Sequence, residues 1–351
     1  MTKADVTRWA ILGTGPVAHK FLAGLKALGS AAQVTQIASR RSESAQAFGK
    51  QYGVPAAADY ASALSAADVD AVYIAVPPAA HEYLALAAIA AGKAVLIEKP
   101  VAIDGNAARR IAAAADAAGV FCMEAMWTRF LPLISKAKER VESGDIGEPR
   151  SLTGSFGIPN QPDSGASLFD PMSGGGALMH RGFYAVSLAR TFLGPVKEVF
   201  ATARLGESGV DEDCAIVLHH ECGAISTLTA SLRALATNDL TVSGTHGRLT
   251  LESPIYRPFS ATLVTTTPRK EMHGAGRIGA LRESALAQAL VQRLPVRGKI
   301  IRAYYKGNGY HYQAAEVARC LAAGTTSSPL MPMTLSIEVM DILDKARASF
   351  K

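Results

Sequence analysis

Two side chains that can do chemistry stand at the end of an apolar run. In VLIEKPVAI, residues 95–103, Glu98 and Lys99 close the run and Pro100 follows them. A lysine held at the end of a buried strand can reach a bound cofactor and a substrate oxygen. Pro100 fixes the backbone beside it, and the Lys99–Pro100 bond is a candidate for the cis form. Taken in isolation, the pattern is equally consistent with a lysine on the surface.

A second set of residues predicts where a cofactor binds. The sequence GTGPVA follows the first apolar run and has the form GxGxxA. Gly13 permits a tight turn, Gly15 brings the backbone close to a pyrophosphate, and Ala18 lets the following helix pack on the strand. Pro16 and Val17 start that helix. In the context of strand, loop and helix, this motif predicts a dinucleotide-binding site.

The end of the second strand indicates which dinucleotide binds. An NAD site usually carries an acidic residue there for the ribose 2′-hydroxyl, whereas a 2′-phosphate needs cationic or hydroxyl partners. The sequence IASRRSES offers Ser39, Arg40 and Arg41. Guanidinium groups match the geometry of a phosphate. NADP(H) is therefore favoured over NAD(H), and a solvated arginine pair is the alternative interpretation.

Alternating strands and helices must position these residues. Apolar runs that read as strands lie at 8–13, 33–39, 70–76, 94–98 and 120–124, and alanine-rich helical stretches separate them. This order predicts a doubly wound parallel sheet, the Rossmann architecture, over residues 1–125. Ligands of such a sheet bind outside the carboxyl ends of its strands. Lys99 stands at one of those ends.

The pattern changes after the first domain. Residues 126–351 contain several runs that alternate as half-buried strands do, separated by turn residues rather than by helices. They predict an α+β domain built on an open, mainly antiparallel sheet with helices on one side. We expect this domain to bind the substrate and to form oligomers.

The charge of the chain is concentrated in one segment. The formal net charge is +6, while residues 269–306 hold nine Lys or Arg and two Glu, a local net of 9 − 2 = +7. We interpret residues 269–303 as a basic helical insertion that packs on its own domain or on another subunit. Binding of nucleic acid or of a membrane surface by this segment is the minor alternative.

Composition narrows the class further. The four cysteines show no metal-type spacing, and no apolar run reaches the roughly 20 residues needed to span a membrane. The first strand begins by about residue 8, which leaves no room for a secretory leader. We therefore expect a cytoplasmic protein with reduced cysteines, no metal site, no membrane attachment and no nucleic-acid partner.

Several motifs together resemble a known family. They are GTGPVA, IASRR, EKPVAI, MEAMWTRFLP (123–132), FDPMSGGGALMHRGFYAVSLAR (169–190) and GNGYHYQAAEVARCLAAG (307–324). Their order is similar to that of the Gfo/Idh/MocA oxidoreductases, and most similar to the branch of dihydrodiol dehydrogenase and glucose-fructose oxidoreductase. The resemblance implies a Rossmann domain, a second domain with an open sheet, association through that sheet, and a nicotinamide cofactor.

The resemblance also implies catalytic residues. Lys99 matches the lysine of the family's EKP motif, and Tyr184 matches the tyrosine that follows GGGAL. A lysine ammonium beside a tyrosine stabilises phenolate, so either group can move the proton. The family usually has aspartate where this chain has His180. If residues 177–193 are helical, His180 and Tyr184 share a face, and His180 either exchanges a proton or orients Tyr184.

Five further residues are assigned to the cofactor side of the site. Glu98 adjoins Lys99, and Pro77 lies in the sequence PPAAHEY together with His81. His81 either approaches the nicotinamide or lies on the surface at a helix start. Trp127 is placed near the substrate pocket, with interdomain packing as the alternative, and Arg129 contacts either the cofactor or the other domain.

The sequence as a whole predicts an NADP-dependent oxidoreductase. Its substrate would be a sugar, polyol, cyclic diol or related small carbonyl compound, and the enzyme would be a homodimer or larger homo-oligomer formed through the C-terminal sheet. A catalytically silent NADP-binding regulator is the alternative, because His180 departs from the family pattern.

Overall fold

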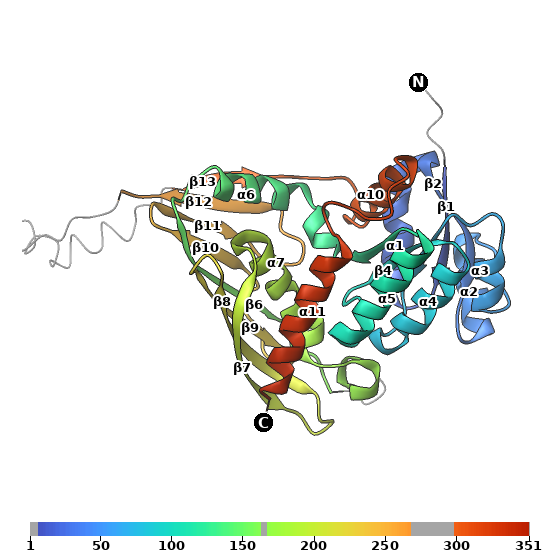
Figure 1. Cartoon of the computed structure of the whole chain (residues 1–351), viewed down its shortest axis with the longest axis horizontal. Helices are drawn as coiled ribbons and strands as arrows, with labels where there is room; N and C mark the ends of the chain where they lie inside the picture. The colour runs from blue at the N-terminus through green and yellow to red at the C-terminus, as the bar shows by residue number, and fades with distance from the viewer. Residues whose placement is uncertain (1–5, 163–166, 268–297, 351) are drawn as a thin grey trace, which may run out of the picture.

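Two β-sheets and the helices between them make up the protein. The computed structural model describes residues 6–162, 167–267 and 298–350. In Figure 1 the N-terminal sheet lies at the right and the C-terminal sheet at the left, with helices of both parts packed between them. The two sheets are linked by the segment that follows the fifth strand.

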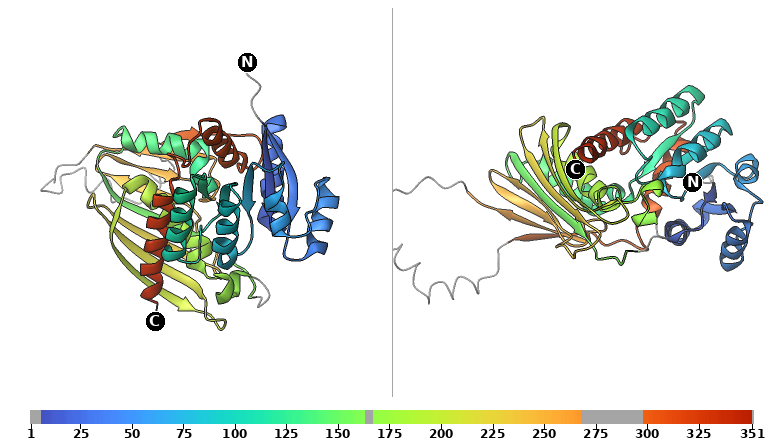
Figure 2. Two further views of the ribbon diagram at one scale, coloured as in Figure 1. Left: turned by 45° about the vertical axis from the view of Figure 1, so that its right-hand side comes forward. Right: turned by 90° about the horizontal axis from the view of Figure 1, so that it is seen from below.

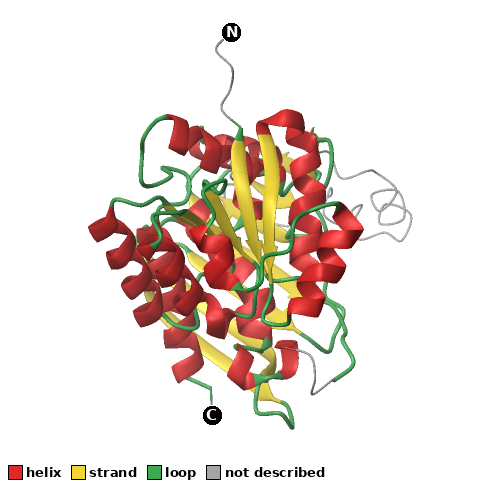
Figure 3. Cartoon of the chain, turned by 90° about the vertical axis from the view of Figure 1, so that its right-hand side faces the viewer, coloured by secondary structure: helices red, strands yellow, loops and turns green. Residues whose placement is uncertain are grey.

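The N-terminal sheet is parallel and has the strand order β2-β1-β3-β4-β5. Its strands are β1 (Thr7–Leu12), β2 (Ala32–Ala38), β3 (Ala71–Ile74), β4 (Ala94–Glu98) and β5 (Cys122–Ala125). Its helices are α1 (Pro16–Leu25), α2 (Ser42–Tyr52), α3 (Tyr60–Ser65), α4 (His81–Ala90) and α5 (Gly105–Ala118). Figure 3 shows helices on both sides of these strands. The predicted doubly wound sheet is confirmed.

Burial on both faces explains the sequence of the central strands. Every residue of β3 and β4 is buried, so these strands read as continuous apolar runs rather than as alternating ones. The helices have ordinary sequence signals at their ends. Asp59 and Asp104 cap α3 and α5 with their side chains, and α2 and α5 end at Gly53 and Gly119 in the left-handed conformation.

The C-terminal sheet has eight strands in the order β13-β12-β11-β10-β6-β9-β8-β7. The strands are β6 (Pro149–Gly157), β7 (Val196–Leu205), β8 (Asp211–His220), β9 (Ile225–Ser231), β10 (Leu240–Gly244), β11 (Gly247–Leu251), β12 (Ser260–Thr265) and β13 (Lys299–Arg302). Neighbouring strands are antiparallel except for the parallel pair β6 and β9. The predicted mainly antiparallel sheet is therefore confirmed.

Helices cover one face of this second sheet. They are α6 (Pro132–Glu142), α7 (Phe183–Leu193) and α11 (Met333–Ala348), while α10 (His311–Ala322) packs against α1. Figure 2 shows the strands of the sheet with the helices on one side. In β9, buried Leu228 and Ala230 alternate with exposed Thr227 and Thr229, as expected of a sheet with one open face.

Only the C-terminal end of the basic insertion is described, and this end is a strand rather than a helix. Most of residues 269–303 lie outside the described residues, and the predicted amphipathic helix lies there too. Lys299–Arg302 form strand β13, which pairs with β12, so this end of the segment extends the sheet instead of forming a helix. Within the described ranges, no helix is long and apolar enough to cross a membrane, and no group of His, Cys, Asp or Glu could hold a metal ion.

Candidate active site

The glycine loop leaves open space at the start of α1. Gly13 has a φ of 113°, and a Cβ there would lie 2.2 Å from the carbonyl oxygen of Ala75. Gly15 caps α1, Pro16 is its first residue, and a Cβ on Gly15 would meet nothing within 4 Å. Buried Ala18 lets the helix pack on the sheet. Free backbone N–H groups at such a helix start bind phosphate.

A cleft of about 460 Å³ joins this loop to the end of β2. Gly13, Gly15, Ser39, Arg40 and Arg41 all line it. Pro77 lines it as well, whereas Val17, in the first turn of α1, is not among its lining residues. No carboxylate is among its lining residues. The residues present therefore fit a dinucleotide, with phosphate groups at the helix start and at the two arginines.

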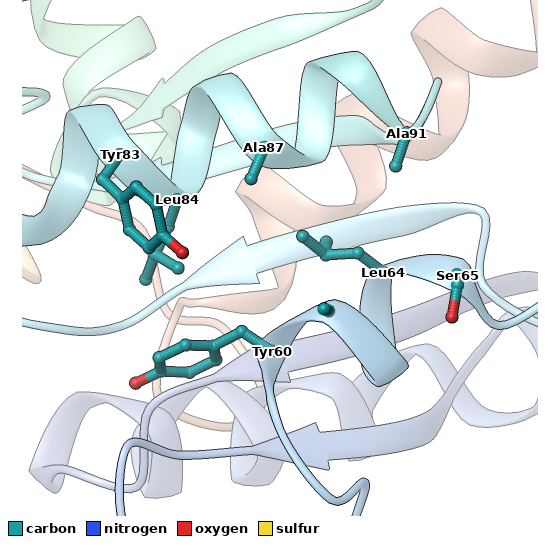
Figure 4. A pocket seen from close by; sticks show the side chains of 8 residues that line it. Tyr60, Leu64, Ser65, Tyr83, Leu84, Ala87 and Ala91 are labelled. Carbon is teal, nitrogen blue, oxygen red and sulfur yellow. The ribbon is translucent and has the colours of Figure 1, made fainter.

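An apolar pocket of about 250 Å³ extends this cleft between α3 and α4. Tyr60, Tyr83 and Leu84 line both spaces. Figure 4 shows Tyr60 on α3 and Tyr83 on α4 on opposite sides of the pocket. Neither tyrosine stands in a motif, so the sequence carries no signal for these aromatic residues. Their rings offer flat apolar walls beside the site for the phosphates.

The EKP turn, residues 98–100, follows β4 and is held by contacts with two other segments. The Lys99–Pro100 peptide bond is cis. Glu124 accepts the N–H of Val101 at 2.7 Å, and Nδ1 of His81 lies 2.9 Å from the carbonyl oxygen of Pro100. These contacts fix the backbone on which Lys99 stands. Glu124 lies in the motif MEAMWTRF, although sequence analysis did not select it.

The structure corrects the expectation for His81. Its ring is fully buried rather than at the surface, and burial lowers its pKa to about 4. Nε2 lies 2.8 Å from the carbonyl oxygen of Val76, so the ring connects the end of β3 to the Lys99–Pro100 turn. Its side chain does not line the cleft, and its two ring nitrogens contact the backbone of this turn and of the end of β3.

Lys99, which follows β4, and Tyr184, on α7, come together although they belong to different domains. Nζ of Lys99 lies 4.8 Å from the centre of the Tyr184 ring and donates a hydrogen bond to the carbonyl oxygen of His180 at 3.4 Å. Residues 178–182 form one π-helical turn that runs directly into α7. This segment is helical, but its first turn is wider than the α-helical turn that we expected. Such π turns often occur at functional sites.

Burial sets the protonation of these groups. It lowers the pKa of Lys99 to about 8, with the charge of Arg181 acting in the same direction. It raises the pKa of Tyr184 well above its usual value, and nearby Glu98 adds to this shift. It lowers the pKa of His180 to about 3. Near neutral pH, His180 is therefore uncharged and Tyr184 keeps its proton, while Lys99 can exchange one.

Glu98 is buried and does not line the cleft. Its carboxyl group is 4% exposed and accepts a hydrogen bond from the hydroxyl of Tyr73, which is fully buried in β3. Burial raises the pKa of Glu98 to about 7. We expected Glu98 to contact the cofactor, and the structure shows a buried partner of Tyr73 next to Lys99. The sequence offered no signal for Tyr73, because a tyrosine within a buried strand reads as core.

Trp127 joins the aromatic wall of the site. Its Nε1 donates to the hydroxyl of Tyr184 at 3.3 Å, and its ring stacks on Tyr310 with the centroids 4.7 Å apart. The rings of Tyr256 and Phe156 also stack on each other, at 5.2 Å. Trp127 thus contacts the residue expected to bind substrate, and does not line the dinucleotide cleft.

Arg129 is held against a helix of its own domain. It donates to the hydroxyl of Thr191 at 2.5 Å and to the carbonyl oxygen of Ser187 at 3.4 Å, both on α7. Arg129 does not line the cleft, and these contacts lie within residues 126–351 rather than between the two domains.

The fold and the site together define a class of protein. A Rossmann sheet with an open glycine loop, and a lysine beside a tyrosine at its carboxyl edge, are features of an oxidoreductase that uses a nicotinamide dinucleotide. Residues 7–126 match the model of the oxidoreductase family with an NAD-binding Rossmann fold, and residues 134–250 match the C-terminal domain of the same family. The chain belongs to the Gfo/Idh/MocA family.

Individual relatives agree with this assignment. The chain is 30% identical to trans-1,2-dihydrobenzene-1,2-diol dehydrogenase of Mus musculus, over 97% of its own length and 96% of the relative. It is 31% identical to the enzyme of that name in Oryctolagus cuniculus, over 96% of both chains. The structure of KijD10, a 3-ketoreductase from Actinomadura kijaniata in complex with NADP and TDP-benzene, is similar with a TM-score of 0.83 at 25% identity, covering 99% and 98% of the two chains.

These relatives carry the names of enzymes. The chain is accordingly an oxidoreductase with an NAD(P)-binding Rossmann fold, and its relatives give no support to the alternative of a silent regulator.

Proposed function

We propose that the protein is an NADP-dependent dehydrogenase or reductase that acts on the hydroxyl or carbonyl carbon of a small cyclic diol, sugar or polyol. Residues 1–125 would bind the cofactor and residues 126–351 the substrate. The observation that carries this proposal is the contact between Lys99 and Tyr184, at 4.8 Å, at the carboxyl edge of the Rossmann sheet. The names of the dihydrodiol dehydrogenases and of the 3-ketoreductase support the substrate class.

The lining of the cleft supports NADP(H) over NAD(H). Ser39, Arg40 and Arg41 stand where the 2′-substituent of the adenosine ribose would lie, and no lining residue offers a carboxylate for a 2′-hydroxyl. A carboxylate there would repel a phosphate, whereas two guanidinium groups attract it. The complex of the 3-ketoreductase with NADP agrees with this preference.

Lys99 would transfer the proton to or from the substrate oxygen. The bound nicotinamide supplies or accepts the hydride, and a proton must reach or leave the substrate oxygen at the same time. With a pKa of about 8, the ammonium of Lys99 can donate this proton during reduction, and the neutral amine can accept it during oxidation. The raised pKa of Tyr184 suits it to donate a hydrogen bond to that oxygen rather than to act as a base.

His180 would act by holding these two residues in place. Its backbone oxygen accepts the Lys99 hydrogen bond, and its ring is nearly buried and uncharged at neutral pH. A base with a pKa of about 3 is poorly matched to proton transfer near pH 7. Positioning of Lys99 is therefore the better-supported role.

The open sheet face is the candidate surface for a homodimer or larger homo-oligomer. Thr227 and Thr229 are exposed on β9, and Phe200 is 53% exposed on β7. A second copy of the chain would cover this face. Light scattering of purified protein across a concentration series tests the association, and a constant monomer mass contradicts it.

The proposed activity is tested by cofactor binding and turnover. NADPH should quench protein fluorescence at lower concentration than NADH, and absorbance at 340 nm should change with at least one compound from a panel of cyclic diols, sugars and dicarbonyls. Tight NADPH binding without turnover on any panel member would remove support from the substrate class. Absence of NADPH binding would contradict the cofactor assignment.

A further inference from the structure

Arg181 is a cation of the site that forms no ion pair within the described residues. It follows His180 in the π turn, and its guanidinium lies 4.7 Å from the centre of the Phe156 ring. Nη2 donates to the side-chain oxygen of Asn160 at 3.2 Å, whereas Nε is buried and has no hydrogen-bond partner. Among the described residues, no Asp or Glu forms an ion pair with Arg181.

The acidic groups nearby are already engaged. Glu98 accepts the hydroxyl of Tyr73, and Glu124 accepts the N–H of Val101. His180 cannot add a negative charge, unlike the aspartate that the family usually has there. Neither carboxylate forms an ion pair with Arg181 in the described part of the chain. The charge of Arg181 contributes to the lowered pKa of Lys99.

A partly buried guanidinium without a counter-ion is unfavourable unless a ligand supplies one. The N–H groups of an arginine guanidinium donate charge-assisted hydrogen bonds to the oxygens of a carboxylate. Phe156 covers one face of the guanidinium and so fixes its plane. Tyr184 is three residues further along the helix, so an anion on Arg181 would lie close to the reacting group.

We propose that the substrate carries a carboxylate close to the carbon that is oxidised or reduced, and that Arg181 binds this carboxylate. The proposal rests on the proposed function and narrows its substrate to hydroxy acids or oxo acids, such as uronic acids. Arg181 then sets specificity, whereas Lys99 and Tyr184 act on the neighbouring oxygen.

Binding to the complex with NADP⁺ tests the proposal without turnover. Calorimetry would compare four acids with their uncharged counterparts: D-glucuronate with D-glucose, D-galacturonate with D-galactose, glycerate with glycerol, and quinate with its methyl ester. The protein should bind at least one acid about tenfold to a hundredfold more tightly than its counterpart, the range expected for a charge-assisted hydrogen bond. Arg181→Met should remove this preference.

Two further variants distinguish an effect of the Arg181 charge from a loss of the folded state. Asn160→Asp keeps Arg181 but gives it an internal carboxylate partner, so it should also abolish the preference for the acid. Arg190→Met is the matched control, because Arg190 lies on the adjoining helix and is already paired with Glu338 at 2.7 Å. This control should retain the preference of the natural chain, and NADPH affinity measures the folded state of each variant.

Equal affinity for acid and counterpart in all four pairs, or no binding of any acid, overturns the proposal. A preference that survives in both Arg181→Met and Asn160→Asp overturns it as well. Hydride transfer to an uncharged substrate is scored separately, so loss of the proposed specificity and failure of the proposed activity give different results.

Discussion

The dinucleotide cleft and the catalytic edge of the same sheet are built in different ways. The part of the cleft assigned to phosphate groups comes from two short stretches, residues 13–15 and 39–41, through backbone groups and largely accessible side chains. The catalytic edge gathers Lys99, Trp127 and Tyr184 from three separate segments, and these side chains are mostly buried. Local sequence dictates the first region, whereas tertiary packing sets the second. Substitutions should therefore separate cofactor affinity from the rate of the chemical step.

The largest expected effect is on the catalytic edge. Lys99→Ala removes the group with a pKa of about 8 that would exchange the proton in the proposed mechanism. We expect kcat to fall by about 10³-fold, within the range of a lost general acid or base, while the Kd for NADPH changes little. Steady-state rates and fluorescence titration of the same preparation measure the two quantities. A kcat near that of the natural chain would remove Lys99 from the mechanism.

The second-largest expected effect is on the cofactor preference of the cleft. Arg40→Asp replaces a cation lining the cleft with a carboxylate suited to a 2′-hydroxyl. The ratio of NADPH to NADH affinity should fall by about 10²-fold, because a charged hydrogen bond is lost and a repulsion is added. The kcat with saturating cofactor should change far less. An unchanged affinity ratio would show that the 2′-phosphate lies elsewhere.

A smaller effect is expected from pH alone. Because the lowered pKa of Lys99 is about 8, its amine becomes available as a proton acceptor as pH rises toward that value. The rate of oxidation should therefore increase by up to about tenfold per pH unit below pH 8 and then level off. The rate of reduction needs the ammonium, so it should stay level below pH 8 and fall above it. Persistence of this profile in the residual activity of Lys99→Ala would contradict the assignment.

The smallest effect is expected at His180. His180→Asp restores the residue that the family usually has, and adds a negative charge beside Lys99. The charge should raise the pKa of Lys99, so the pH profile should shift upward while the maximal rate changes by only about a fewfold. A collapse of activity with intact NADPH binding would instead indicate a specific chemical role for the imidazole.

The difference between local sequence and tertiary packing also decides which features could be predicted from the sequence. The strands, the glycine loop and the cluster Ser39–Arg41 could be predicted, since each depends on neighbours within a few residues. Tyr73, Glu124 and Tyr310 could not, because their roles depend on partners in distant segments. His81 shows the same limit: its position in the sequence indicated a site residue, but only packing reveals that its ring supports the Lys99–Pro100 turn.

The π turn at residues 178–182 gives the site a simple way to change its specificity during evolution. Such a turn accommodates one residue more than an α-helical turn, and each residue of an α-helix rotates the chain by about 100°. Deleting one residue from it would turn His180 and Arg181 relative to Tyr184 while leaving α7 in place. A single-codon deletion could therefore exchange the side chains presented to the substrate and spare the cofactor cleft, which makes length variation in this turn a route to new specificity.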